Sequence, residues 1–334
     1  MALLYPRILH VSPKVLCLLV ATVCSQTLHA QETPNSQTEF AKSTFTYKTV
    51  GDVKIDADVY RVPDKVKRPV VVWIHGGALI IGTRAGVPPQ LKDLAIQEGF
   101  IIVSLDYRLG PEAQLPEIVS DVTDALDWVH DKGPNLFHSD PSRLVVAGAS
   151  AGGYLALMSG LHPKVKPNAI VSYWGFGDID GDWTTKPSES YRKGKLIDKE
   201  VAWSGVGKEV LTSTNQENGR GRSAFFLYLK QTGTWVNALT GLDPKTDRDK
   251  LTPFCPNRNV TPEFPPTLFL HGTADIDVPV EQTHLMVAEL KKHNIPQETI
   301  IIEGGGHGLW GGDKQKIEAA FARSAEYIRE QLTK

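Results

Sequence analysis

The sequence predicts an α/β fold built on a mostly parallel, doubly wound sheet. Six short segments are mostly apolar and rich in β-branched residues, which is typical of strands buried on both faces of a parallel sheet. Four helical patterns alternate with them, and such alternation indicates double winding. The strands are expected at 69–74, 100–105, 144–147, 169–174, 267–270 and 299–302, and the helices at 118–130, 154–161, 283–292 and 317–332.

Two further segments complete the predicted domain. An antiparallel hairpin is expected from strands at 44–50 and 53–62, which flank a Gly-Asp turn. The segment 176–262 interrupts the alternation and carries no clear strand. Long insertions in compact domains are usually functional, so we expect a single domain over 44–334 with an inserted cap at 176–262; the alternative is a surface excursion without a role.

The N-terminal region is typical of an export signal. Arg7 and Lys14 give a basic start, the apolar run 15–23 follows, and Ala30 offers a small residue for cleavage. The apolar run is too short to cross a bilayer, which takes about 20 apolar residues. We therefore expect a signal peptide at 1–30, a secreted or periplasmic protein, and no stable membrane association after signal removal. A lipoprotein site at Cys24 is a weaker alternative.

The expected mature chain starts with a polar, flexible segment at 31–43 and retains a single cysteine, Cys255. It cannot form an internal disulfide, and export with one thiol fits a bacterial periplasm or exterior. The chain has 334 residues, of which 41% are hydrophobic, and its formal net charge is −2. Such a charge gives no electrostatic reason to expect nucleic acid or an anionic membrane as partner.

The strongest local motif is GASAG at 148–152, between an expected strand and an expected helix. A G-x-S-x-G turn in that context strains the Ser backbone and lifts its hydroxyl clear of the sheet. The N-terminus of the following helix favours developing negative charge. Ser150 is therefore the candidate nucleophile. The pentapeptide alone is a weak signal, and its alternative is an ordinary Gly-rich turn.

A Ser hydroxyl needs a base and an orienting acid, which in this context follow in the order Ser, acid, His. Asp275 stands just beyond the expected strand 267–270. Residues at strand ends point into the crevice where ligands bind, so Asp275 is the candidate acid. Asp277 and Glu303 remain its rivals.

The candidate base is His307, in the glycine-rich loop after the last expected strand. His271 also follows a strand, but it precedes Asp275 on the same loop and is expected to be a hydrogen-bonded core residue. Chain order therefore favours His307.

The fourth component is HGGA at 75–78, directly after a buried strand. Acyl transfer builds negative charge on a carbonyl oxygen, which backbone N–H groups stabilise. Glycines let the backbone come close to the substrate. We expect an oxyanion hole formed by the N–H groups of Gly76 and Gly77 on one side and Ala151 on the other, with His75 as a structural brace.

Taken in order, these motifs resemble the hormone-sensitive-lipase-like and bifunctional feruloyl and acetyl-xylan esterase-like carboxylesterases of the α/β-hydrolase superfamily. The motifs are HGGA at 75–78, DYRLGPE at 106–112, GASAGG at 148–153, HGTADIDVP at 271–279 and GGGHG at 304–308. The resemblance implies the triad Ser150, Asp275 and His307, the oxyanion hole named above, and neither a metal nor an organic cofactor. It covers roughly 45–175 and 262–332.

Two departures separate this chain from the lipase-like branch, which usually has Gly where this chain has Ala78 and Asp where it has Ala149. Backbone donors survive both changes. The insert lies outside the resemblance; its residues 225–229 and Trp235 could wall a substrate pocket or pack the cap onto the sheet, and packing is the favoured interpretation.

The predicted function is hydrolysis of carboxylic esters through an acyl-enzyme on Ser150. The substrate is expected to be a small-molecule or carbohydrate ester with a short acyl group, such as acetyl, or with feruloyl, which rests on family analogy. The alternatives are a prolyl-oligopeptidase-like peptidase and a non-catalytic ligand-binding pseudo-hydrolase. The sequence indicates no particular oligomeric state.

Overall fold

In a computed structural model of the chain, residues 40–334 are described. The expected signal peptide at 1–30 and most of the polar segment 31–43 lie outside the described residues. None of the helices within 40–334 combines the length and the apolar character that a membrane span requires.

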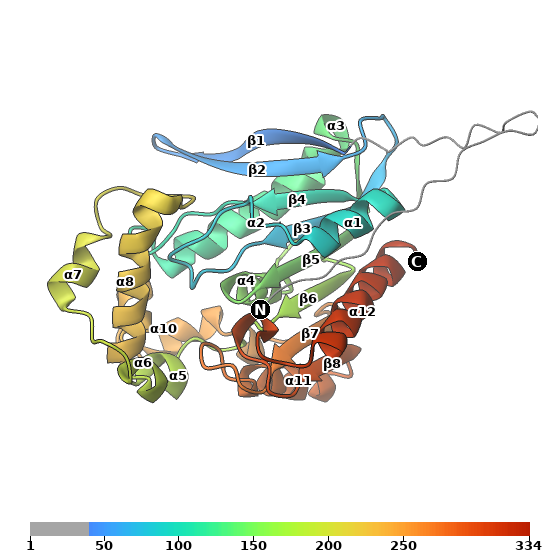
Figure 1. Cartoon of the computed structure of the whole chain (residues 1–334). Coiled ribbons are helices and arrows are strands. Elements are labelled where there is room, and N and C mark those ends of the chain that lie inside the picture. Colours follow the sequence, from blue (N-terminus) through green and yellow to red (C-terminus); the bar gives the residue numbers. More distant parts are fainter. Residues whose placement is uncertain (1–39) are drawn as a thin grey trace, which may run out of the picture. The chain divides into compact units, whose positions relative to one another are not determined.

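Eight strands form one mixed sheet in the order β1-β2-β4-β3-β5-β6-β7-β8 (Figure 1). The hairpin strands β1 and β2 are antiparallel, β2 joins β4 antiparallel, and the remaining neighbours are parallel. The predicted α/β fold, with its mostly parallel sheet and N-terminal hairpin, is thus confirmed. The strands are β1 Ala41–Val50, β2 Val53–Arg61, β3 Arg68–Ile74, β4 Ile101–Leu105, β5 Ser139–Ala149, β6 Ala169–Tyr173, β7 Thr267–Gly272 and β8 Gln297–Ile302.

The expected boundary at 43/44 is wrong, because β1 begins at Ala41. Its first residues look polar and unstructured in sequence, but they continue the ladder with β2. Lys42 Nζ lies 3.2 Å from Asp58 Oδ2, and Thr44 Oγ1 donates to Asp58 Oδ1 at 2.7 Å. Backbone pairing and these side-chain contacts extend the strand where apolar periodicity gives no signal.

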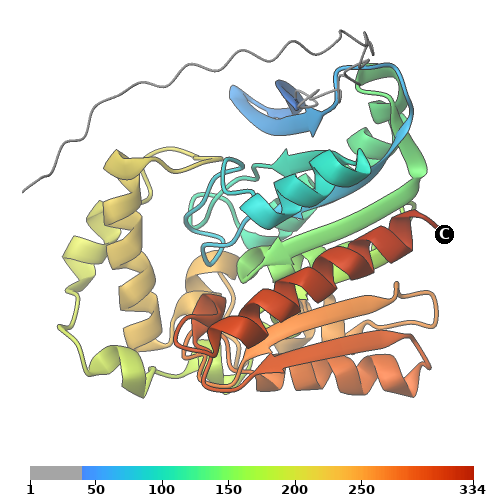
Figure 2. The same cartoon turned by 45° about the vertical axis from the view of Figure 1, so that its right-hand side comes forward.

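Helices cover both faces of the sheet, and the alternation of side chains along each strand separates two cores. Val70 and Val72 belong to one core, which includes residues of α2, α4 and α11. Val71 and Trp73 belong to the other, which includes residues of α1 and α12; Figure 2 shows α12 in front of the sheet. These helices are α1 Pro89–Glu98, α2 Leu115–Asp131, α3 Gly133–Leu136, α4 Ala151–Ser159, α11 Glu281–Lys292 and α12 Lys314–Leu332.

The segment 176–262 joins β6 to β7 and consists of short helices and turns around one long helix, α8 (Figure 1). Every residue of it is described, and none is in a strand. Its elements are α5 Asp182–Thr185, α6 Glu189–Arg192, α7 Lys199–Ser204, α8 Gln216–Thr232, α9 Trp235–Thr240, α10 Arg248–Leu251, and the 3-10 turns η1 Thr252–Phe254 and η2 Pro256–Arg258.

A buried arginine ties α8 to the body of the domain. Arg222 is 1% exposed and donates to the main-chain oxygens of Ile80 at 3.0 Å and Gly110 at 2.8 Å. Its Nη2 also lies 2.6 Å from Glu112 Oε1. The long helix of the insert is therefore held against the loops that follow β3 and β4.

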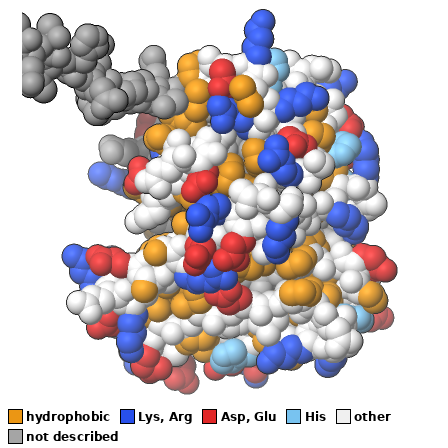
Figure 3. All heavy atoms as spheres, turned by 90° about the vertical axis from the view of Figure 1, so that its right-hand side faces the viewer, with side chains coloured by type: hydrophobic (Ala, Val, Ile, Leu, Met, Phe, Trp, Pro, Cys, Tyr) orange, Lys and Arg blue, Asp and Glu red, His pale blue; other side chains and the backbone are white. Residues whose placement is uncertain are grey.

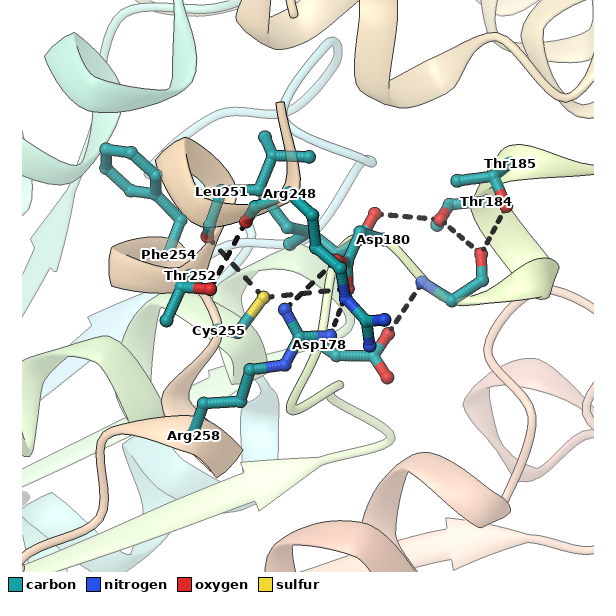
Figure 4. Close-up of polar contacts among 12 residues, drawn as sticks. Asp178, Asp180, Thr184, Thr185, Arg248, Leu251, Thr252, Phe254, Cys255 and Arg258 are labelled. Carbon is teal, nitrogen blue, oxygen red and sulfur yellow. Dashed lines mark hydrogen bonds and ion pairs between the residues drawn. The ribbon is translucent and has the colours of Figure 1, made fainter. Parts of the chain in front are cut away.

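The two ends of the insert meet at a second ionic cluster. Arg258 and Arg248 both point at Asp180, and the sulfur of Cys255 lies among them (Figure 4). Arg258 Nη1 lies 2.9 Å from Asp180 Oδ2, and Arg248 Nε lies 3.5 Å from the same oxygen. Cys255 is fully buried, and its burial raises the pKa of the thiol to about 12. Charged contacts thus fasten the insert where it leaves and rejoins the sheet.

The surface drawn in Figure 3 mixes acidic and basic side chains, with hydrophobic ones scattered between them. Scattered apolar residues are normal on soluble domains and mark no site.

Candidate active site

Ser150 lies in the tight turn between β5 and α4, with φ 56° and ψ −120°. A non-glycine residue with positive φ is strained, and such strain clusters at functional sites. The turn is held by the Ser150 N–H, which donates to Tyr173 O at 2.8 Å. Packing also demands Gly152, because a Cβ there would collide with the main-chain oxygen of Ile74 at the end of β3.

The structure brings the three candidate catalytic residues into one hydrogen-bonded row. His307 Nε2 lies 2.9 Å from Ser150 Oγ, and His307 Nδ1 lies 2.8 Å from Asp275 Oδ2. The residues come from the segments after β5, β8 and β7, which end at the same edge of the parallel sheet. Because a carboxylate only accepts, Nδ1 carries the proton and Nε2 is free to accept the Ser150 hydroxyl proton.

Asp275 is held as an ionised acceptor. Its Oδ1 accepts the N–H groups of Asp277 at 2.8 Å and Val278 at 2.9 Å. Burial acts to raise the pKa of Asp275, but hydrogen bonds from His271 and His307 outweigh it, and the pKa lies well below its usual value. Asp275 can therefore orient His307 and stabilise an imidazolium without taking its proton.

The alternative candidates for the orienting acid and for the base lie in other positions. The Asp277 carboxylate accepts the Tyr191 hydroxyl, and Glu303 is exposed. His271 is fully buried, with Nδ1 2.8 Å from Thr283 Oγ1 and Nε2 2.9 Å from Val278 O. Among these groups, it is Asp275 that faces His307 Nδ1, and His271 has the hydrogen-bonded core position expected of it.

Backbone N–H groups of the predicted oxyanion hole lie beside Ser150. A Cβ on Gly76 would stand 3.2 Å from Ser150 Cβ, so this loop passes directly over Ser150. Gly77 has φ 106°, and a Cβ there would collide with Ile81 O. Ala151 is the first residue of α4, where an N–H has no intrahelical acceptor. Over the described residues, these three N–H groups donate to no other protein group.

His75 supports this loop from within the core. It is 4% exposed, its ring stacks on Tyr107 with 4.3 Å between centroids, and its Nδ1 lies 2.8 Å from Gly76 O. Burial lowers the pKa of His75 to about 4, so the ring is neutral at pH 7. These contacts match the bracing role expected for it.

Ser150 and His307 open into a cavity of about 270 Å³, which the insert closes on one side. Its other lining residues are Gly77, Ala78, Ile81, Phe176, Trp183, Thr184, Phe226, Lys230, Trp235, Asp277 and Val278. Two roles were considered for the aromatic residues of the insert, lining a pocket and packing onto the sheet, and each role applies to some of these residues. Phe225 is fully buried in the core, whereas its neighbour Phe226 and the mostly buried Trp235 line the cavity.

Sequence reasoning missed several cavity residues, among them Phe176, Trp183 and Lys230. None stands in a motif, and an isolated Trp or Lys in an irregular segment carries no signal of its own.

Asp275, Asp277 and His307 also form the kind of group that can hold a metal, with one ligand atom from each within 4.8 Å of the others. Hydrogen bonds already engage these groups, since both His307 nitrogens and both Asp275 oxygens face protein partners. A metal here would have to displace the contacts that align Ser150, so hydrogen bonding accounts for the group better than metal binding.

The sheet order and the serine turn at its centre define the class: the chain has an esterase-like α/β-hydrolase fold, which is consistent with ester hydrolysis. A family model described as BD-FAE matches residues 57–290. The chain belongs to this family.

Solved structures share this fold at low sequence identity. A protein of unknown function from Staphylococcus aureus subsp. aureus Mu50 has a TM-score of 0.68 at 20% identity, over 87% of this chain and 100% of that one. An α/β-hydrolase superfamily protein from Enterococcus faecalis has a TM-score of 0.67 at 19% identity, over 87% and 99%. A truncated carbohydrate esterase from gut microbiota has a TM-score of 0.63 at 19% identity, over 90% and 99%.

Curated relatives are much longer proteins. The non-reducing polyketide synthase prhL of Penicillium brasilianum is 27% identical over 88% of this chain, which spans 14% of that protein's length.

Proposed function

We propose that the chain is an exported serine hydrolase that cleaves carboxylic esters through an acyl-enzyme on Ser150. The observation that carries the proposal is the row Ser150–His307–Asp275, with 2.9 Å and 2.8 Å between the paired atoms. The esterase-like fold supports the reaction class, and the signal pattern at 1–30 supports export.

In the first half-reaction, His307 Nε2 takes the Ser150 proton as Oγ attacks the ester carbonyl carbon. The carbonyl oxygen becomes an oxyanion, which the N–H groups of Gly76, Gly77 and Ala151 stabilise. Asp275 holds the imidazolium through Nδ1–H. The imidazolium then gives its proton to the departing alkoxide, which leaves as the alcohol and yields the acyl-enzyme.

In the second half-reaction, water replaces the alcohol. His307 takes a proton from the water as its oxygen attacks the acyl carbon, and the same N–H groups stabilise the second oxyanion. Collapse breaks the bond to Ser150 Oγ, which recovers the proton from His307. The products are one acid and one alcohol, and the enzyme returns to its starting state.

The substrates proposed are esters with short acyl groups, such as acetyl, or with feruloyl, on carbohydrate. The cavity of about 270 Å³ suits one small group rather than a long chain. Aromatic walls suit the apolar faces of a sugar or phenyl ring. The structural neighbour from gut microbiota is a carbohydrate esterase, which gives this substrate class fold-level support only.

The proposal is tested with purified protein, p-nitrophenyl acetate and a fluorophosphonate probe. We expect ester turnover and labelling at Ser150, with Ser150→Ala losing on the order of 10⁶-fold in kcat while it unfolds cooperatively like the wild type. Full activity in Ser150→Ala, or labelling at another residue, would reassign the nucleophile. Turnover of peptide anilides in preference to the ester would favour the peptidase alternative, and a folded protein without turnover or labelling would favour the pseudo-hydrolase.

A further inference from the structure

The lining of the catalytic cavity includes a cationic side chain, that of Lys230. Lys230, near the C-terminal end of α8, lines the cavity and is 6% exposed. Its Nζ donates to the main-chain oxygen of Asp277 at 2.8 Å and lies 5.2 Å from the Trp183 ring centroid and 5.7 Å from that of Tyr191. Across residues 40–334, no carboxylate oxygen comes within ion-pair distance of this ammonium.

A buried ammonium in such surroundings needs an explanation. Lysine is almost never fully buried unless it is paired, and burial lowers the pKa of Lys230. Aromatic faces attract a cation but accept no conventional hydrogen bond. Of the three ammonium donors, the Asp277 carbonyl satisfies one. A purely bracing role between α8 and the loop after β7 explains that one donor and leaves the other two without a protein acceptor.

An acceptor lies beside this donor. The Asp277 carboxylate also lines the cavity, and its Oδ1 accepts the Tyr191 hydroxyl. No described hydrogen bond engages its Oδ2. A carboxylate oxygen of Asp277 also lies within 4.8 Å of a nitrogen of His307. A pure donor and a pure acceptor therefore both line the cavity, next to the base and beside the rings of Trp183 and Tyr191.

We infer that Lys230 and Asp277 form a subsite that binds a hydroxyl group of the ester substrate, close to the ester bond. A hydroxyl accepts from Lys230 and donates to Asp277 at once, so a single group gives the ammonium a second acceptor and the carboxylate a second donor. A carboxylate in this place would face the like charge of Asp277, and an apolar group would leave the ammonium unpaired. The inference rests on the proposed esterase function and names its substrate class: hydroxylated esters.

The hydroxyl can come from either half of the ester, and two matched pairs distinguish the sources. For the alcohol half, cyclohexane-1,2-diol monoacetate is compared with cyclohexyl acetate. For the acid half, methyl 3-(4-hydroxyphenyl)propanoate is compared with methyl 3-phenylpropanoate. In the wild type we expect kcat/KM to favour the hydroxylated member of one pair by roughly 10- to 100-fold, the range of a hydrogen bond to a charged group.

The variant Lys230→Met keeps an unbranched side chain that is one atom shorter and removes its donors. In the favoured pair we expect the kcat/KM ratio to fall towards one, mainly through KM of the hydroxylated ester. Lys186→Met is the matched control, because Lys186 is on the same insert, is 67% exposed and lies outside the cavity. That control should keep the wild-type ratio, and Lys230→Leu, which also lacks donors, replaces Lys230→Met if the latter does not fold.

Equal kcat/KM values within both pairs in the wild type would overturn the inference while leaving the esterase proposal intact. A preference that survives loss of the Lys230 ammonium would overturn it as well, since a bracing role alone predicts that result. Absence of turnover for all four esters, together with no fluorophosphonate labelling, would reject the proposed function and with it the subsite.

Discussion

The edge of the sheet and the insert above it are built on different principles. At the sheet edge, Ser150, His307 and Asp275 lie in a row of hydrogen bonds, each on the segment that follows a strand of the sheet. The insert has no strand and is held by ionic contacts, which join Arg222 to Glu112 on the loop after β4 and Arg258 to Asp180. The comparison suggests a division of labour in which the sheet fixes the reaction and the ionically fastened insert shapes the space for the substrate.

The largest effect is expected at the sheet edge. Asp275→Asn leaves the shape of the site but no longer holds the His307 tautomer, so kcat for p-nitrophenyl acetate should fall about 10⁴-fold. Steady-state kinetics on the purified variant measure this loss, and thermal unfolding checks that the variant is folded. A greater loss of kcat from Asp277→Asn than from Asp275→Asn would identify Asp277 as the orienting acid. It would contradict the account of the sheet edge given above.

The second-largest effect is expected for a variant in the insert, and it concerns the free energy of unfolding. Arg222→Met leaves Glu112 buried without its partner, which should lower the free energy of unfolding by about 3–5 kcal/mol. Urea denaturation measures the change. Adding Glu112→Gln to Arg222→Met should restore part of the loss, because the unpaired charge is then removed. An unchanged free energy of unfolding in Arg222→Met would mean that the buried pair does not fasten the insert.

A smaller effect is expected at His75, which supports the loop at 75–78, and this effect depends on pH. His75 is neutral in the fold, with its pKa lowered to about 4 by burial from 6.5. Between pH 6.5 and 4 the unfolded chain binds a proton at this residue that the folded chain does not, so stability falls as the pH falls. The loss should reach about 3 kcal/mol over this window.

Urea unfolding at a series of pH values measures that slope. His75→Asn keeps a donor for the Gly76 carbonyl but cannot titrate, so its free energy of unfolding should decline less over the same range. Identical slopes in the two proteins would show that His75 does not titrate below its usual pKa in the fold.

The sheet edge was largely predictable from sequence, because each of its residues depends on local chemistry. Ser150 sits in a turn whose neighbours must be small, and short apolar runs mark where the strands before Asp275 and His307 end. Apolar runs mark strands well, but α1 was missed: its buried Leu91, Leu94 and Ala95 make too short a pattern.

The insert was far less predictable, since its geometry depends on partners that are distant in the chain. Phe225 and Phe226 are adjacent, yet one enters the core and the other the cavity. Composition cannot separate them until the position of the helix on the sheet is known. Lys230 is the extreme case, because lysine is ordinarily a surface residue and its burial arises from tertiary packing alone.

The placement of Cys255 has a practical consequence. A thiol whose pKa lies near 12 carries almost no thiolate at neutral pH, and the thiolate is the form that oxidants and alkylating agents attack. Its side chain is also fully buried, which keeps such reagents away from the sulfur. In the folded domain this sulfur should remain inert whether the surroundings are oxidising or reducing, so electrophilic probes should leave Cys255 unmodified.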